Sequence, residues 1–328
     1  MSGGAPDPPH AIVTVAGHGG YSIRCRLWEP DDACATVVAV HGVAGHSLWL
    51  EPVARRLAGR GVRTLAMDRC GAGMNGAGRG DAPSAEALIG DLAAVLRRAA
   101  AYGAPVHLCG FCWGSVYAVN ALAALDAEAG AAPEVVTAIH VAPSLFPSAL
   151  VRERPLLTGD SGAPTEAPAM PIECFTEGPA LEAIVEPDPL RLRAVSPRFN
   201  ACLERFSAGL WMKLLRHSRP SLLLLAADDR AVDNAATERL FRRLDADRVS
   251  VRTVPGAHGV QFDAPEEAAA LIAGWVRDAA RDATSRDGGS RSSGPRSGGP
   301  RSGGTRKGEA REQDRLALHR SPDGGPER

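Results

Sequence analysis

Residues 107–119 read H-L-C-G-F-C-W-G-S-V-Y-A-V, and this stretch decides the fold. Its apolar beginning predicts a buried strand, and residues 115–125 have the small and apolar spacing of a packed helix. Between them, Gly110 and Gly114 flank Cys112 in a G-x-C-x-G turn. Glycines suit this turn because the strand and the helix approach closely and the apex residue is strained. The pattern predicts a strand, a tight turn and a helix, with the Cys112 side chain pushed out at the end of the strand.

Cys112 would stand at the N-terminus of that helix, where backbone amides and the helix dipole favour a negative charge. The thiolate is the reactive form of cysteine, so this position suits a nucleophile. A buried structural cysteine is the plain alternative for this residue type, but the flanking glycines argue against it. Cys109 and Cys112 also form a C-x-x-C pair. A redox pair opens a helix without a glycine turn, so the redox reading is disfavoured.

Four further motifs each lie at the end of an apolar run that predicts a strand. They are H-G-V-A-G at 41–45, D-R-C-G-A-G-M-N at 68–75, A-A-D-D-R-A-V at 226–232 and P-G-A-H-G at 255–259. Strands alternate with helical patterns along the chain, which predicts a parallel sheet. The polar residues of all five motifs would then meet at the carboxyl edge of that sheet.

Taken in order, the five motifs resemble those of the α/β-hydrolase superfamily, in particular its monoacylglycerol-lipase and serine-aminopeptidase-like branch. The G-x-C-x-G turn is similar to the family's G-x-S-x-G nucleophile elbow, with cysteine in place of serine. The resemblance covers roughly residues 11–282. It implies an α/β fold with a mostly parallel central sheet and helices on both faces. Cysteine at the elbow also resembles the dienelactone hydrolases, the polyhydroxyalkanoate synthases and cysteine-type thioesterases.

The resemblance assigns a triad of Cys112, Asp229 and His258, in the chain order nucleophile, acid, base. Asp229 is preferred to Asp228 because it directly precedes the R-A-V stretch that matches the family pattern. Its carboxylate would orient the imidazole and stabilise the imidazolium. A histidine that only caps the following helix is the alternative for His258.

The resemblance also implies an oxyanion hole built from the backbone N–H groups of Val43 and Trp113. We expect Asp68 and Asn75 to hold loops together. The residues expected to shape the loops around the nucleophile are His41, Gly42, Gly110 and Gly114. The family pattern favours this loop-shaping role for His41 over a role as a base.

Cysteine changes the expected chemistry, because an acyl-cysteine is a thioester and is attacked more readily than an ester. A thiolate also leaves easily, which favours activated acyl donors. We therefore expect a hydrolase or thioesterase that acts on a small thioester, ester or lactone, free or bound to a carrier protein. Three alternatives stay open: an acyltransferase or cyclase of specialised metabolism, a lyase on the same fold, and a non-catalytic binding protein.

Composition narrows the class of protein. The formal net charge of −1 gives no signature of nucleic-acid or membrane binding. No apolar run approaches the roughly 18–20 residues that span a bilayer, and residues 1–10 do not resemble a secretory signal. Seven cysteines without a disulfide-like spacing favour a reduced cytoplasm. No motif calls for a metal or an organic cofactor, and the oligomeric state stays open.

A composition shift divides the chain. We expect a flexible N-terminus at 1–10, a hydrolase core at 11–142 and 221–283, a lid insertion at 143–220 and a disordered tail at 284–328. The insertion is rich in proline and glycine in its first half and helical in pattern over 190–216. The tail repeats glycine, serine, proline and arginine without apolar residues at 293–304, so it cannot bury a core.

Overall fold

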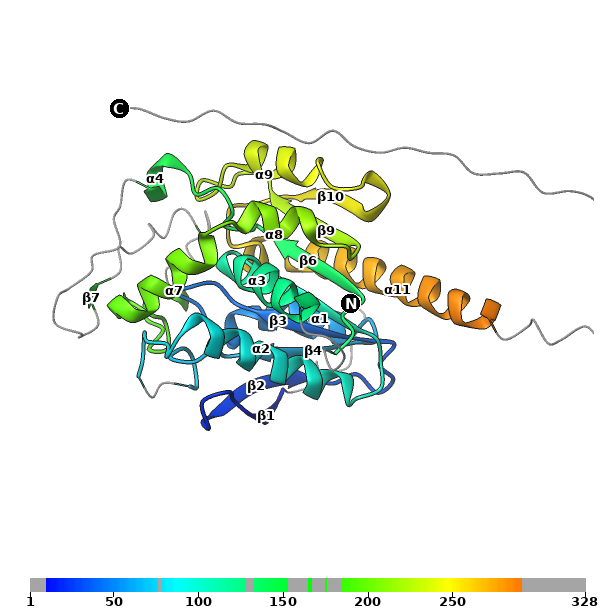
Figure 1. Cartoon of the computed structure of the whole chain (residues 1–328), viewed down its shortest axis with the longest axis horizontal. Helices are drawn as coiled ribbons and strands as arrows, with labels where there is room; N and C mark the ends of the chain where they lie inside the picture. Colours follow the sequence, from blue (N-terminus) through cyan, green and yellow to red (C-terminus); the bar gives the residue numbers. More distant parts are fainter. Residues whose placement is uncertain are drawn as a thin grey trace, which may run out of the picture. The chain divides into compact units, whose positions relative to one another are not determined.

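The computed structural model describes residues 10–75, 78–127, 133–152, 165–166, 175 and 184–290. Within these residues, eight strands form one sheet in the order β1-β2-β4-β3-β5-β6-β9-β10. The first two strands are an antiparallel hairpin, β2 pairs antiparallel with β4, and all other neighbours are parallel (Figure 1). The strands are β1 Ala11–Ala16, β2 Ser22–Trp28, β3 Ala35–Val40, β4 Val62–Met67, β5 Val106–Phe111, β6 Thr137–Val141, β9 Ser221–Ala226 and β10 Val249–Val254. The predicted mostly parallel sheet is confirmed.

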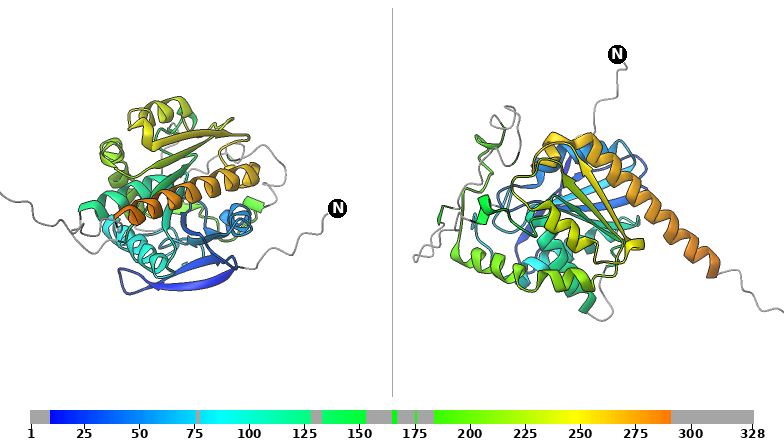
Figure 2. Two further views of the ribbon diagram at one scale, coloured as in Figure 1. Left: turned by 90° about the vertical axis from the view of Figure 1, so that its right-hand side faces the viewer. Right: turned by 90° about the horizontal axis from the view of Figure 1, so that it is seen from above.

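Helices cover both faces of the sheet (Figure 2). One core packs α2, α3, α7, α8 and α9 against the sheet, and a second core packs α1 and α11 against the other face. The helices are η1 Ser47–Leu50, α1 Glu51–Ala58, α2 Ala85–Ala100, α3 Trp113–Ala127, α4 Ala149–Arg152, α7 Pro197–Ser207, α8 Leu210–Arg216, α9 Asn234–Phe241, η2 Ala246–Arg248, α10 Val260–Asp263 and α11 Pro265–Ser290. A short pair, β7 Thr165–Glu166 and β8 Ala194–Val195, stands apart from the main sheet.

The central strands are apolar along their whole length because both of their faces are covered. In β3, Val38 and Val40 point into the first core, whereas Val37 and Ala39 point into the second. Each fully buried valine or leucine contributes about 1.5–3 kcal/mol of transfer free energy. The side chains of β3 therefore pack alternately into the two cores, and this packing holds the strand between them.

The chain reverses its winding direction at β3. After β3 it moves to β4 on one side, and it later returns to β5 on the other side. Val40 of β3 pairs in register with Gly110 of β5, so the two strands end at the same level. The loops that leave adjacent strands at such a switch point form a natural crevice for a ligand.

Three predicted segments differ in detail. The amphipathic pattern over 48–61 predicts one helix, but this segment starts as the 3₁₀ turn η1 and continues as α1, which ends at Ala58. The helical pattern at 190–216 holds only from Pro197, because residues 190–196 are not helical and include β8. It is also interrupted where Gly209 adopts a left-handed conformation with φ of 64° and separates α7 from α8. The closing helix α11 runs to Ser290, past the expected start of the tail at 284. Residues 1–9, most of 153–183 and 291–328 lie outside the described residues, and the predictions made for them stay predictions.

Candidate active site

Cys112 lies at the apex of the turn between β5 and α3. Its φ of 53° is in the left-handed region, which is rare for a residue with a side chain. The flanking glycines make this turn possible. A Cβ atom at Gly110 would come within 2.4 Å of the Ser115 nitrogen, and one at Gly114 within 2.2 Å of the Val40 carbonyl oxygen. The sequence thus folds into the sharp elbow that the glycine pattern predicts.

Asp229 and His258 are in direct contact at the ends of β9 and β10. The Nδ1 atom of His258 is 2.9 Å from Oδ2 of Asp229. The other carboxylate oxygen accepts hydrogen bonds from the backbone N–H groups of Ala231 and Val232, at 2.9 and 3.0 Å. These two bonds fix the carboxylate, which fixes the imidazole. Asp228, the alternative acid, is exposed.

The His258 imidazole is enclosed, with a side chain only 1% exposed. Burial lowers its pKa, but the neighbouring Cys112 thiol and Asp229 carboxylate outweigh burial and raise the pKa well above its usual 6.5. Its Nε2 atom has no hydrogen-bond partner among the described residues. Because Nδ1 faces Asp229, Nε2 is the nitrogen left to exchange a proton with Cys112 or with a substrate. A charged imidazole beside a thiol stabilises the thiolate.

The loop after β3 lies beside the nucleophile position. A Cβ atom at Gly42 would lie 3.2 Å from the Cβ atom and 3.4 Å from the Sγ atom of Cys112, so the backbone of this loop passes directly beside the Cys112 side chain. In the described part of the chain, the backbone N–H groups of Val43 and Trp113 make no hydrogen bond. Both are therefore available to a ligand oxygen next to Cys112, as an oxyanion hole requires.

His41 shapes this loop. Its buried ring contacts the Gly42 carbonyl oxygen through Nδ1 at 2.7 Å, and its Nε2 accepts a hydrogen bond from the Arg69 backbone N–H at 3.4 Å. Burial, followed by the adjacent Arg69 charge, lowers its pKa to about 3. The ring is therefore neutral near pH 7, and both of its nitrogens are used for structure.

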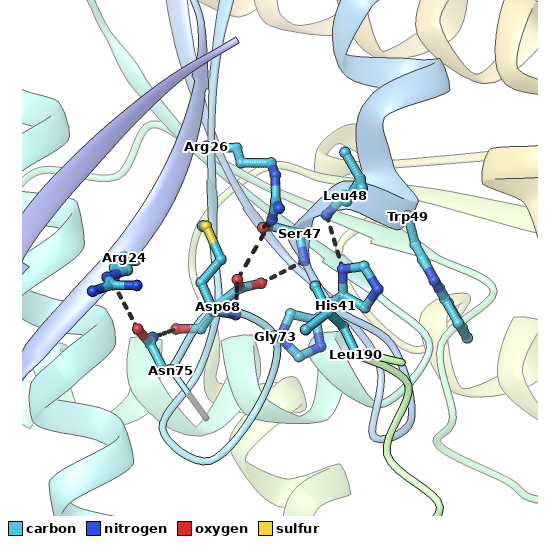
Figure 3. Close-up of polar contacts among 12 residues, drawn as sticks. Arg24, Arg26, His41, Ser47, Leu48, Trp49, Asp68, Gly73, Asn75 and Leu190 are labelled. Carbon is cyan, nitrogen blue, oxygen red and sulfur yellow. Dashed lines mark hydrogen bonds and ion pairs between the residues drawn. The ribbon is translucent and has the colours of Figure 1, made fainter. Parts of the chain in front are cut away.

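Asp68 joins the two loops that follow β3 and β4 (Figure 3). Its carboxylate accepts hydrogen bonds from the backbone N–H groups of Ser47 at 2.6 Å and Met74 at 2.8 Å. Arg26 forms an ion pair with it at 3.5 Å. Asn75 donates its side-chain amide to the Asp68 carbonyl oxygen at 2.5 Å. Asp68 and Asn75 hold these loops together, as the sequence predicts.

Two residues of the predicted insertion contact the loops around the site, and sequence reasoning missed both. The carbonyl oxygen of Phe175 accepts a hydrogen bond from the Gly259 N–H at 2.5 Å, and its ring packs edge-on against His258 with centroids 5.7 Å apart. Asp188 accepts hydrogen bonds from His46 Nε2 and Trp49 Nε1, both at 2.6 Å. Neither residue belongs to a motif or a periodic segment, so no local signal could have identified it.

Within the described ranges, no group of three or more His, Cys, Asp or Glu side chains is placed to hold a metal ion. Cys109 and Cys112 are both free thiols. No described helix combines the length and the apolar character needed to cross a membrane.

Comparison with known proteins places this geometry in a family. A family model described as serine aminopeptidase, S33, matches residues 31–264. No curated protein matches the sequence. Among solved structures, the fold is similar to a monoglyceride lipase from Saccharomyces cerevisiae, with 17% identity and a TM-score of 0.69 over 84% of this chain and 99% of that chain. A monoacylglycerol lipase from Paleococcus ferrophilus has 18% sequence identity and a TM-score of 0.65, over 83% of this chain and 100% of that chain. A thioesterase domain from the curacin biosynthetic pathway has 15% sequence identity and a TM-score of 0.56, over 81% of this chain and 99% of that chain.

Proposed function

The chain belongs to the serine aminopeptidase S33 family of α/β-hydrolases, and from that premise we propose that it hydrolyses activated acyl substrates through an acyl-cysteine on Cys112. The observation that carries the proposal is the left-handed conformation of Cys112 at the elbow. Strained backbone conformations cluster at functional sites, so this conformation supports a reactive role for the Cys112 side chain. The enclosed His258–Asp229 pair beside it supports the same conclusion.

In the first half-reaction, the Cys112 thiolate attacks the acyl carbonyl carbon. A carbon–sulfur bond forms, and the carbonyl π electrons move to the oxygen. The N–H groups of Val43 and Trp113 would bind this oxyanion. When the tetrahedral adduct collapses, the bond to the leaving group breaks, and the His258 imidazolium supplies the proton that the departing thiolate or alkoxide needs.

In the second half-reaction, neutral His258 takes a proton from water through Nε2. The oxygen attacks the acyl-cysteine, and the same N–H groups bind the second oxyanion. Collapse releases the carboxylic acid and regenerates the Cys112 thiolate and the imidazolium. Asp229 stays ionised throughout and holds Nδ1 of the imidazole.

The proposed substrates are thioesters, esters and lactones, either small or presented on a carrier. A thiolate leaves more readily than an alkoxide, so its adducts with unactivated esters and amides tend to revert. Structural neighbours whose names are lipase and thioesterase support an acyl substrate in general. The cysteine at the elbow favours thioesters within that class.

Intact-protein mass spectrometry after incubation with a panel of short and medium acyl thioesters tests the proposal. We expect one acyl group on Cys112 in the wild type, no adduct in Cys112→Ala and accumulation of the adduct in His258→Ala. Accumulation follows because His258 activates the water that removes the acyl group. Cys109→Ala is the matched control, because this neighbouring thiol is buried in β5 and should not be acylated.

Three results would contradict the acyl-cysteine. Turnover that survives Cys112→Ala but is lost in His258→Ala would indicate a lyase. An adduct on another residue would move the nucleophile. No adduct across the panel, with a Cys112 thiol no more reactive than free cysteine, would indicate a binding protein.

Acyl transfer to an acceptor other than water is the second candidate, and the contact between Phe175 and His258 favours it. The ring and the carbonyl of Phe175 close over the histidine loop, and a closed site limits the access of water to an intermediate. Product analysis in the presence of added amines and alcohols separates the two reactions. A transferase gives amide or ester in excess of the free acid.

A further inference from the structure

Arg69 is a completely buried cation beside the loop that follows β3. Its exposed fraction is 0%. No carboxylate among the described residues forms an ion pair with it, and its Nε atom has no hydrogen-bond partner there. The guanidinium instead donates to two backbone carbonyl oxygens, those of Val43 at 2.5 Å and Cys70 at 3.3 Å.

Aromatic rings cover this guanidinium. Its Cζ atom lies 4.3 Å from the ring centroid of Phe199 in α7 and 5.9 Å from that of Trp113 in the elbow. Burial lowers the pKa of Arg69 to about 10, so the group is still charged near pH 7. The buried Asp68 carboxylate acts in the opposite direction to burial on this pKa, but among the described residues it forms no ion pair with the guanidinium. A buried charge without a direct ion pair is costly for stability. Its retention therefore calls for a compensating role.

The contacts of Arg69 converge on Val43 from two directions. The guanidinium binds the carbonyl oxygen of Val43 directly. The Arg69 backbone N–H binds Nε2 of His41, and Nδ1 of His41 contacts the Gly42 carbonyl oxygen. That carbonyl and the Val43 N–H belong to the same peptide group, so a bond to one end fixes the direction of the other. Both peptide groups that flank the Val43 Cα are held.

We propose that Arg69 is a positioning residue for the oxyanion hole: it holds the Val43 N–H toward the acyl oxygen and favours the negative charge that develops there. The guanidinium holds the carbonyl of the peptide group that follows Val43, and this fixes the Val43 N–H through the Cα atom that the two peptide groups share. The bond from His41 to the Gly42 carbonyl oxygen lies on the same peptide group as the Val43 N–H and strengthens that N–H as a donor. A cation in a region of low dielectric also stabilises a nearby anion more strongly than it would in water. The inference rests on the proposed acyl-cysteine function.

The test compares two reagents that attack the same thiol. A trifluoromethyl ketone adds to the Cys112 thiolate at its carbonyl carbon and leaves a tetrahedral oxyanion. Iodoacetamide forms a carbon–sulfur bond and expels iodide, without forming an oxyanion. An oxyanion-positioning residue affects only the first reaction, whereas damage to the elbow or to the thiol affects both.

The variants are Arg69→Met, Arg69→Lys and the control Arg219→Met. Arg219 also holds a backbone carbonyl, that of Val135, but at the opposite end of the sheet. For Arg69→Met we expect the affinity for the trifluoromethyl ketone and kcat to fall about 10- to 100-fold, below the effect of deleting a donor outright. The alkylation rate should change less than about threefold, because the His258–Asp229 pair beside the thiol is unchanged. Arg69→Lys keeps the charge but not the forked donors, so its ketone affinity and kcat should lie between those of the wild type and those of Arg69→Met.

Wild-type affinity in Arg69→Met, or equal losses for both reagents, would overturn the inference. Replacing a buried charge by an apolar residue of similar volume is often tolerated; if Arg69→Met does not fold, Arg69→Lys supplies the same two-reagent comparison. A wild-type protein that forms no ketone adduct on Cys112 would instead refute the acyl-cysteine function itself. The two failures are therefore distinguishable.

Discussion

At the scale of single residues, the site depends on the electrostatic interactions of His258 with Cys112 and Asp229. Burial opposes the charge on His258, but Cys112 and Asp229 raise its pKa well above 6.5. A raised pKa in the folded state stabilises the fold below the unfolded value of about 6.5, and this contribution is lost as pH rises through the folded value. In the proposed mechanism, the same balance keeps a proton on His258 for the leaving group.

Asp229→Asn should lower the pKa of His258, because it replaces a carboxylate at 2.9 Å by a neutral amide. NMR titration of the histidine ring protons measures this shift, and Cys112→Ala should shift the same resonance in the same direction. We expect kcat/KM for a thioester to fall about 100-fold in Asp229→Asn, less than the roughly 10⁴-fold loss in serine triads. The smaller loss follows because a thiolate needs less help from a base. Asp228→Asn is the control, and an equal effect there would reassign the acid.

At the scale of elements, the β5–α3 elbow depends on glycines at close approach. Gly114→Ala should destabilise the fold by about 1–3 kcal/mol, the usual cost of overpacking, because its Cβ would lie 2.2 Å from the Val40 carbonyl oxygen. Gly274→Ala in α11 is the matched control. Apart from its chain neighbours and the backbone of α11, no atom of the described residues lies within 4 Å of its added Cβ, so it should be neutral or stabilise the helix by up to about 1 kcal/mol. Urea unfolding measures both, and equal effects would contradict the packing argument.

The segment around Asp188 ties the predicted insertion to the loop after β3. Asp188→Ala would leave two buried donors, His46 Nε2 and Trp49 Nε1, without an acceptor. We expect the free energy of unfolding to fall by about 1–3 kcal/mol. We also expect faster alkylation of Cys112, because the insertion segment would be held less tightly against the loop after β3. Thermal unfolding and iodoacetamide kinetics measure the two effects. Unchanged alkylation with lowered stability would mean that the contact is structural only.

The sequence predicts elements well where both faces are buried, because the apolar run itself marks the strand. The apolar pattern at 62–67 predicts a strand, and β4, which is buried at all but one position, has these bounds. The break at Gly209 was missed, because a glycine that adopts a left-handed conformation looks no different in sequence from one inside a helix.

Some residues of the candidate site can also be predicted from local sequence patterns, and others cannot. Glycine spacing and motif order point to Cys112 and His258, because these signals are local. Phe175, Asp188 and Arg69 act through contacts with segments distant in the chain. The Asp188–His46 bond, for example, joins residues 142 positions apart. Such contacts exist only once the fold is formed.

At the scale of the whole molecule, buried histidines set the acid limit of stability. Burial is the main cause that lowers the pKa of His107 and His217 to about 4 and of His41 and His140 to about 3. A histidine with a lowered folded pKa stabilises the fold above pH 6.5. Each loses up to about 1.4 kcal/mol per pH unit as the pH falls below that value.

His140 in β6 isolates one such contribution. Both of its ring nitrogens lack hydrogen-bond partners among the described residues, and its ring packs against Phe241 with centroids 5.2 Å apart. His140→Leu should change the free energy of unfolding by less than about 1.5 kcal/mol at pH 7.5, as an apolar replacement in a core. At pH 5 the wild type must protonate His140 on unfolding, so the variant should gain about 2 kcal/mol relative to it. Urea unfolding at both pH values measures this difference. His217, whose charge also lowers the pKa of His140, is present in both proteins. Parallel pH profiles would contradict a neutral buried His140, because they would require the ring to hold its proton as readily in the fold as in the unfolded chain.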